Sequence, residues 1–243
     1  HAAVKKRLVA DVPVGAFLSG GIDSSVISSI AAKYTPHLNT FSIGFKDEPF
    51  FDETKYAQLV AKKLNTEHTT FSLTNSDLLE HLYEILNYID EPFADSSAIL
   101  VYILSQYTKE KATVALSGDG ADEIFSGYNK HAAFYKAQNG GVMADAVKAL
   151  HPLWRILPKS RNGKISNKIR QLERFAKGLK MTAQDRYWAW ACLGGEKGTL
   201  DLFQQEIQNK YIMSNLRSRR DTYFDPVPDD YNINSKFKKN YKA

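Results

Sequence analysis

The chain of 243 residues is 43% hydrophobic and 24% charged, a composition typical of a folded chain with a sizeable core. No stretch approaches the roughly 18 consecutive apolar residues that a membrane span needs, so we expect a cytoplasmic protein with no membrane partner. Its single cysteine, Cys192, excludes an intrachain disulfide and a cysteine-based zinc site.

Charge is distributed unevenly along the chain. Residues 1–121 carry a formal net charge of −5 and residues 122–243 one of +10. The basic excess is concentrated in residues 155–180, where nine Lys or Arg side chains accompany one acid, Glu173. Because this stretch lacks the repeated aromatic side chains on which bases stack, we interpret it as a solvated helical face, and nucleic acid is not an expected partner.

Strand-like and helical patterns alternate through the first half of the chain. Runs rich in apolar and β-branched residues predict strands over residues 12–19, 38–45, 68–73 and 112–118. Apolar residues at three-and-four spacing predict helices between them, over residues 24–34, 53–64, 76–89, 97–110 and 121–136. This alternation is typical of an α/β fold with a doubly wound parallel sheet, in which ligands bind beyond the carboxyl ends of the strands.

The second half is expected to be a helical region, because strand signals stop after about residue 137. We therefore divide the chain into a core over residues 1–137, a helical part over 138–222, and a loop or disordered tail over 223–243. Candidate functional residues are sought in the core, where His131 is interpreted as a surface residue of a helix and not as a catalyst.

The string "SGGIDSS", residues 19–25, joins the first predicted strand to a helix. Gly20 and Gly21 allow the backbone to approach a phosphate closely, and the serines add hydroxyl donors at a helix N-terminus, where anions bind. A carboxylate beside phosphates needs a cation between them, so Asp23 is interpreted as a ligand of Mg²⁺, with helix capping as the alternative. The Walker A pattern occurs nowhere in the chain, which excludes a phosphate loop of that type.

A second string, "LSGDGADEIFSGY" at residues 116–128, also follows a predicted strand. If this strand lies beside the first one, its carboxyl end faces the same crevice. Asp122 then completes the magnesium site, while Ser117 and Gly118 contact the nucleotide. The alternative is a helix N-terminus that is stabilised by its own acids.

These strings carry a resemblance to a known family. "SGGIDSS" resembles the pyrophosphate-binding loop (PP-loop) of the ATP pyrophosphatase superfamily, whose members split ATP into AMP and pyrophosphate. Together with "DVPVGAFLSGGIDSS" and with "DEPFADSSAI" at residues 90–99, the second string resembles the synthetase domain of the glutamine-dependent asparagine synthetase family. The resemblance covers residues 4 to about 135 and implies an adenine nucleotide alpha hydrolase-like fold.

The resemblance also implies roles for individual residues. The implied nucleotide contacts are Leu18 and Ile43 on adenine and ribose, Gly44 close to the nucleotide, and Ser117 and Gly118 on AMP. The implied pyrophosphate contacts are Ser19, Gly20, Gly21, Ser24 and Ser25, and the implied magnesium ligands are Asp23 and Asp122. Asp119 stands where the family often has Glu, at a position tied to formation of the adenylate, so Asp119 and Asp23 are the implied catalytic residues.

The implied activity is ATP-dependent adenylation of aspartate to β-aspartyl-AMP with release of pyrophosphate, followed by amidation by ammonia to asparagine and AMP. The implied cofactors are ATP and Mg²⁺. Ammonia would come from a glutaminase domain absent from this chain, and family members continue past its end to a lysine that it lacks, so we expect a fragment. For the full-length protein the resemblance allows a homodimer.

Three alternatives stay open at this point. The first is a related amidotransferase or β-lactam-forming synthetase that acts on another carboxylate, with "DEPFADSSAI" as part of the wall of its acid site. The second is a transfer-RNA-modifying enzyme of the same superfamily, which would use the basic second half. The third is a fragment that binds nucleotide without turnover.

Overall fold

The computed structural model describes residues 1–91, 95–192, 201–210, 218 and 222. The chain forms two compact units, His1–Ala121 and Asp122–Ala243, each of which is described by itself. The boundary between the units lies at the start of the predicted helix 121–136. The domain limits expected at residues 137 and 222 stay predictions, and the expected tail over 223–243 lies outside the described residues.

The first unit contains a four-stranded parallel sheet, which confirms the predicted α/β fold class. Its strands are β1 (Val14–Phe17), β2 (Asn39–Phe45), β3 (Glu67–Leu73) and β4 (Val114–Leu116), in the spatial order β3-β2-β1-β4. β4 pairs directly with β1, with Val14 opposite Val114. The chain therefore winds outward from β1 in both directions, and the carboxyl ends of β1 and β4 are neighbours at the point where the winding reverses.

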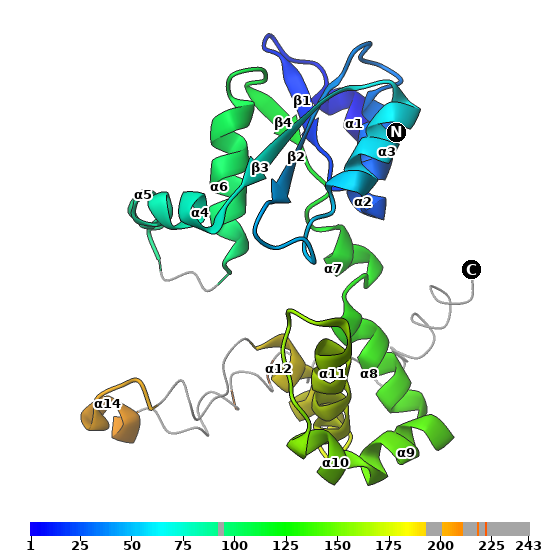
Figure 1. The fold of residues 1–243 in the computed structure, drawn as a ribbon, viewed down its shortest axis with the longest axis vertical. Coiled ribbons are helices and arrows are strands. Elements are labelled where there is room, and N and C mark those ends of the chain that lie inside the picture. Colours follow the sequence, from blue (N-terminus) through cyan, green and yellow to red (C-terminus); the bar gives the residue numbers. More distant parts are fainter. Residues whose placement is uncertain (92–94, 193–200, 211–217, 219–221, 223–243) are drawn as a thin grey trace. The chain divides into compact units, whose positions relative to one another are not determined.

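Helices cover both faces of this sheet (Figure 1). On one face are α1 (Ala2–Arg7), α2 (Ile22–Ala31) and α3 (Thr54–Leu64), and on the other is α6 (Ser97–Thr108), against which α5 (Leu82–Tyr88) packs after α4 (Asn75–Glu80). Ala16 of β1 is fully buried in a cluster with Val4 of α1 and Ala31 of α2. Leu18, which follows β1, packs against Ala57 and Ala61 of α3.

The two faces of β2 carry different chemistry. Phe41 faces α6, where its ring stacks on Phe71 of β3, and Phe71 in turn contacts Tyr107 of α6 with ring centroids 5.1 Å apart. Thr40 and Ser42 face α3 and are buried, since successive side chains of a strand point to opposite faces. β2 is thus apolar toward α6 and polar toward α3.

Two predicted helices are interrupted in the structure. The helix expected over 76–89 is α4 and α5 with His81 between them, although Ile85 N still donates to His81 O at 3.1 Å, so the interruption is local. The helix expected over 121–136 is α7 (Ala121–Phe125) followed by α8 (Asn129–Asn139). Ser126 adopts a left-handed backbone with φ of 59°, which ends α7.

The second unit is helical in its described residues, as expected. After α7 and α8 it contains α9 (Val142–Ala149), α10 (His151–Ile156), α11 (Lys164–Gly178), α12 (Ala183–Ala191) and α14 (Gln205–Lys210). α11 packs against α9, α10 and α12, and α8 packs against α12. His131 of α8 is buried and its ring stacks on Tyr187 of α12, so its interpretation as a surface residue was wrong. Within the part of the chain that the structure describes, no helix is long and apolar enough to cross a membrane.

Candidate functional site

The turn after β1 is shaped by Gly20. Its backbone φ is +83°, a conformation that side chains disfavour. A Cβ at this position would lie 2.5 Å from the backbone nitrogen of Ala57 and 2.6 Å from the Cβ of Tyr56, both in α3. Gly20 therefore allows the turn to lie directly on the first turns of α3, and any larger residue would push the two segments apart.

The serines of this turn hydrogen-bond to one another. The hydroxyls of Ser19 and Ser24 lie 3.0 Å apart, the amide of Ser19 donates to the Ser24 hydroxyl at 3.2 Å, and the amide of Gly21 donates to the Ser19 hydroxyl at 3.3 Å. The Ser25 hydroxyl is buried and has no hydrogen-bond partner among the described residues. Ser19 and Ser24 thus shape the turn, while Ser25 has an unused donor, which is costly unless a ligand satisfies it.

The N-terminus of α2 is left uncapped by side chains. Its N-cap residue is Gly21, with no side-chain hydrogen bond to the first turn, so amide donors of that turn stay free for a ligand. Asp23 lies inside the first turn and is half-buried, and the described residues give its carboxylate no hydrogen bond or ion pair. The alternative interpretation of Asp23 as the helix cap was therefore wrong.

The turn after β4 lies against the same helix end. A Cβ on Gly118 would lie 2.8 Å from the backbone nitrogen of Ser24 and 3.0 Å from the Cβ of Asp23. Beside it, the Ser117 hydroxyl donates to the Asp119 carboxylate at 2.9 Å and accepts from the Asp119 amide at 3.3 Å. The structure thus brings the turn of the second string onto the first turn of α2, because β4 neighbours β1.

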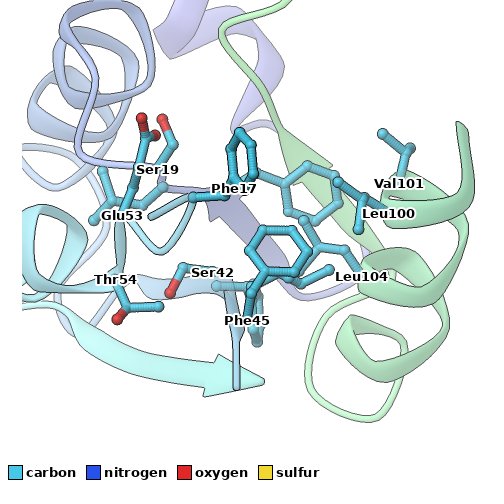
Figure 2. A pocket seen from close by; sticks show the side chains of 13 residues that line it. Phe17, Ser19, Ser42, Phe45, Glu53, Thr54, Leu100, Val101 and Leu104 are labelled. Carbon is cyan, nitrogen blue, oxygen red and sulfur yellow. The ribbon is translucent and has the colours of Figure 1, made fainter. Parts of the chain in front are cut away.

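An apolar pocket of about 210 Å³ opens beside the turn after β1 (Figure 2). Leu18 and Ile43 are among its lining residues, and so is Ser19 of the turn. The remaining lining residues come from β1, β2, the segment before α3, the first residue of α3, and α6: Phe17, Phe41, Ser42, Phe45, Phe51, Glu53, Thr54, Leu100, Val101 and Leu104. A pocket with aromatic walls and few polar groups suits a flat apolar ring.

Gly44 is buried, and its missing side chain makes room for the start of α3 and the residues just before it. A Cβ on Gly44 would lie 2.7 Å from Cγ2 of Thr54 and 3.2 Å from a carboxylate oxygen of Asp52. Asp52 accepts a hydrogen bond from the Thr54 amide at 2.9 Å, which satisfies a free backbone donor at the start of α3. The close approach that Gly44 permits in this structure is that of α3, and its implied contact with a nucleotide stays a prediction.

Asp122 belongs to the second unit, so its predicted pairing with Asp23 of the first unit stays a prediction. Within its own unit, a Cβ on Gly127 would collide with the Asp122 carboxylate, so the absence of a side chain at 127 leaves the space that this carboxylate occupies. The neighbouring Glu123 accepts a hydrogen bond from the Tyr128 hydroxyl, and this bond lowers the pKa of Glu123 below its ordinary value.

The residues of the first unit fit a phosphate group with its cation. Free amides at the N-terminus of α2, the orphaned Ser25 hydroxyl and the backbone approach allowed by Gly20 form a cradle of donors. The unpaired carboxylate of Asp23 is an oxygen ligand of the kind Mg²⁺ uses, and Mg²⁺ commonly takes one or two carboxylates with phosphate oxygens and waters. The described residues contain no cluster of three or more His, Cys, Asp or Glu side chains that would hold a metal by themselves.

Part of the pocket could not be found from the sequence. Leu100, Val101 and Leu104 reach it from α6, far along the chain from the glycine-rich turn, and their apolar spacing is that of any helix packed on a sheet. Glu53 was also missed, although the pair of acids before α3, Asp52 and Glu53, was an available signal. Residues 92–94 of the string expected in the wall of an acid site lie outside the described residues.

Comparison with known proteins identifies similar chains. A profile of the family described as asparagine synthase matches residues 1–222. A protein of Bacillus subtilis strain 168, asparagine synthetase [glutamine-hydrolyzing] 1, is 43% identical over 127 residues, or 52% of this chain and 20% of that protein. A Methanocaldococcus jannaschii protein, putative asparagine synthetase [glutamine-hydrolyzing] 2, is 35% identical over 223 residues, or 88% of this chain and 40% of that protein.

Escherichia coli K12 asparagine synthetase B [glutamine-hydrolyzing] is 33% identical over 154 residues, which are 56% of this chain and 27% of that protein. The similarity therefore spans between one-fifth and two-fifths of the length of these three relatives. The matching family profile covers residues 1–222, and so includes both turns that meet at the N-terminus of α2.

Proposed function

The chain belongs to the asparagine synthase family, and from this premise we propose that it is the adenylating part of an ATP-dependent carbon–nitrogen ligase. Its substrates are ATP and aspartate. A carboxylate oxygen of the aspartate side chain attacks the α-phosphorus of ATP, the bond to the β-phosphate oxygen breaks, and pyrophosphate leaves. Ammonia then displaces AMP from β-aspartyl-AMP to give asparagine.

The observation that carries this proposal is the packing of Gly118 against Asp23 and Ser24. It brings two turns, each following a strand of the same sheet, to one uncapped helix N-terminus. The proposed pyrophosphate site is the first turn, with Ser19, Gly20, Gly21, Ser24 and Ser25. The proposed AMP contacts are Ser117 and Gly118 of the second turn, with Leu18, Ile43 and Gly44 at the base and ribose.

No side-chain nucleophile is needed for this chemistry. Negative charge grows on the leaving pyrophosphate in the transition state, and preorganised amide dipoles at the α2 N-terminus stabilise it. Mg²⁺, when bound, would neutralise phosphate oxygens, and its proposed ligands are Asp23 and Asp122. Asp119, oriented by the Ser117 hydroxyl, is the proposed carboxylate for formation of the adenylate.

The experiment that tests the proposal is exchange of labelled pyrophosphate into ATP by this chain, with and without aspartate. We expect exchange that requires aspartate and that Asp23→Asn abolishes. Binding of ATP without exchange would contradict adenylation by this chain and leave a nucleotide-binding fragment. Exchange with another acid in place of aspartate would contradict the assigned substrate and favour a related synthetase. Ammonia as nitrogen donor, the homodimer and the cytoplasmic location stay predictions.

A further inference from the structure

The pocket and the turn after β1 meet at the start of α3. Gly20 of the turn lies against Tyr56 and Ala57, while Glu53 and Thr54, less than one helical turn earlier, line the pocket. If the base of ATP occupies the apolar pocket and its phosphates occupy the turn, as the proposed function requires, the ribose must lie between them. The segment at Glu53 is therefore next to the sugar.

Glu53 is the single ionisable residue among the thirteen that line the pocket. Figure 2 shows its side chain and that of Ser19 pointing to the same side, away from the aromatic rings of the pocket. Its exposed side chain has no hydrogen-bond or ion-pair partner in the described parts of the chain, whereas the adjacent Asp52 accepts a hydrogen bond from the Thr54 amide. Glu53 is thus an unused acceptor at the junction of the pocket and the turn.

The Glu53 carboxylate is exposed, so water solvates it until a ligand binds beside it. Its charge repels phosphate oxygens, but it accepts hydrogen bonds from neutral hydroxyls, and the pair of hydroxyls on a ribose presents two donors to one carboxylate. We propose that Glu53 recognises the ribose 2′- and 3′-hydroxyls, so that the site selects ribonucleotides over deoxyribonucleotides. This inference rests on the proposed function for the identity of the nucleotide.

The test is calorimetric titration of the 243-residue chain with Mg²⁺ and either ATP or 2′-deoxy-ATP. A hydrogen bond to a charged group is lost with 2′-deoxy-ATP, so we expect the unaltered chain to bind it roughly tenfold to hundredfold more weakly than ATP. In Glu53→Ala the two affinities should differ by about twofold or less, because the acceptor is gone. The matched control is Glu48→Ala, an acid of the same segment outside the pocket lining, which should retain the discrimination.

Each result decides the inference. Equal binding of ATP and 2′-deoxy-ATP by the unaltered chain, or discrimination retained in Glu53→Ala, would overturn the assignment of Glu53 while leaving the proposed function intact. Failure of a folded chain, verified by circular dichroism, to bind either nucleotide would overturn both. Loss of discrimination in Glu53→Ala alone, with Glu48→Ala unchanged, supports recognition of the ribose by Glu53.

Discussion

Gly20 combines a left-handed backbone with the closest approach of the turn to α3. Replacement by alanine adds backbone strain at φ of +83° and places a methyl group 2.5 Å from the backbone of Ala57. The strain alone costs about 1–2 kcal/mol, and the clash with backbone atoms, which cannot move aside as a side chain can, adds to it. We therefore expect Gly20→Ala to lower the free energy of unfolding by about 3 kcal/mol or more in urea titrations.

A matched control separates these two causes. Gly120 has the same φ of +83°, but nothing lies within 4 Å of the position its Cβ would take. Gly120→Ala should therefore show the strain alone, about 1–2 kcal/mol. Equal destabilisation in the two variants would refute the close approach of the turn to α3.

Gly118 tests a different contact, that between the second turn and α2. A methyl group at 118 would lie 2.8 Å from the amide nitrogen of Ser24 and would force the turn away from the helix N-terminus. We expect Gly118→Ala to keep the fold, seen by circular dichroism, and to weaken Mg²⁺-ATP binding at least about tenfold, because aligned phosphate donors are lost. Unchanged affinity in a folded variant would remove the second turn from the site.

At the scale of residues, the sequence indicated which residues form the site, but not which of them hydrogen-bond to one another. The glycine pair and serines of residues 19–25 indicated an anion cradle by themselves, since few other local structures need them together. The sequence could not show that Ser19 and Ser24 hydrogen-bond to each other, nor that Ser25 is left without a partner among the described residues. Such contacts depend on side-chain positions within a turn, which residue types alone do not determine.

At the scale of elements, β2 and β3 are joined by side-chain hydrogen bonds on the face of the sheet that α3 covers. The His68 ring lies between two hydroxyls, with Nδ1 3.0 Å from Oγ1 of Thr40 and Nε2 3.1 Å from Oγ of Ser42. Burial lowers the pKa of His68, a shift opposed in part by hydrogen bonding to the backbone of Thr40. The unfolded chain therefore takes up a proton on His68 at a higher pH than the folded chain does.

This difference gives stability a defined pH dependence. Stability from neutral His68 is fully present above its ordinary pKa of 6.5 and is lost as the pH falls from there toward the lower pKa of the folded state. We expect the urea midpoint of the chain to fall between pH 7.5 and pH 5, and His68→Gln to reduce that fall. An equal fall in the variant would show that other groups cause it.

Arg186 links α12 to the C-terminal end of α11. It is buried, and its guanidinium donates to Gly178 O at 2.9 Å and to Met181 O at 3.1 Å. Arg186→Met would leave these carbonyl oxygens without their donor, at a cost of about 1–3 kcal/mol of unfolding free energy in thermal or urea measurements. The control is Lys177→Met, a substitution of an exposed residue of α11, which should change the free energy of unfolding by no more than about 0.5 kcal/mol. Equal destabilisation by the two substitutions would show that the hydrogen bonds of Arg186 do not stabilise the end of α11.

The sequence predicted the existence and type of the strands and most helices, but not their interruptions. Alternating apolar runs indicated the four strands of the parallel sheet, and the pairing of β4 with β1, assumed for the second string, is confirmed. The break at Ser126 was missed because the spacing of apolar residues continues across it. The left-handed backbone of Ser126, which ends α7, does not change that spacing. Burial of His131 depends on Tyr187 of α12, a partner remote in the chain.

At the scale of the molecule, the two structural units carry net charges of opposite sign. The first unit, His1–Ala121, has a formal net charge of −5, and the second has +10. Most of the proposed nucleotide site lies in the acidic unit, whose overall field opposes ATP. Binding there must depend on local donors at the α2 N-terminus and on a cation, because helix-end dipoles act only over the first turn.

Nucleotide binding is therefore expected to depend on Asp23 and magnesium, and one measurement tests this dependence most directly. It is calorimetric titration of the 243-residue chain with ATP, with and without Mg²⁺, beside Asp23→Asn. We predict binding that requires Mg²⁺ and is lost in the variant while its fold, followed by circular dichroism, is kept. Undiminished binding in Asp23→Asn, or no ATP binding by the folded chain, would contradict the proposed role of this turn.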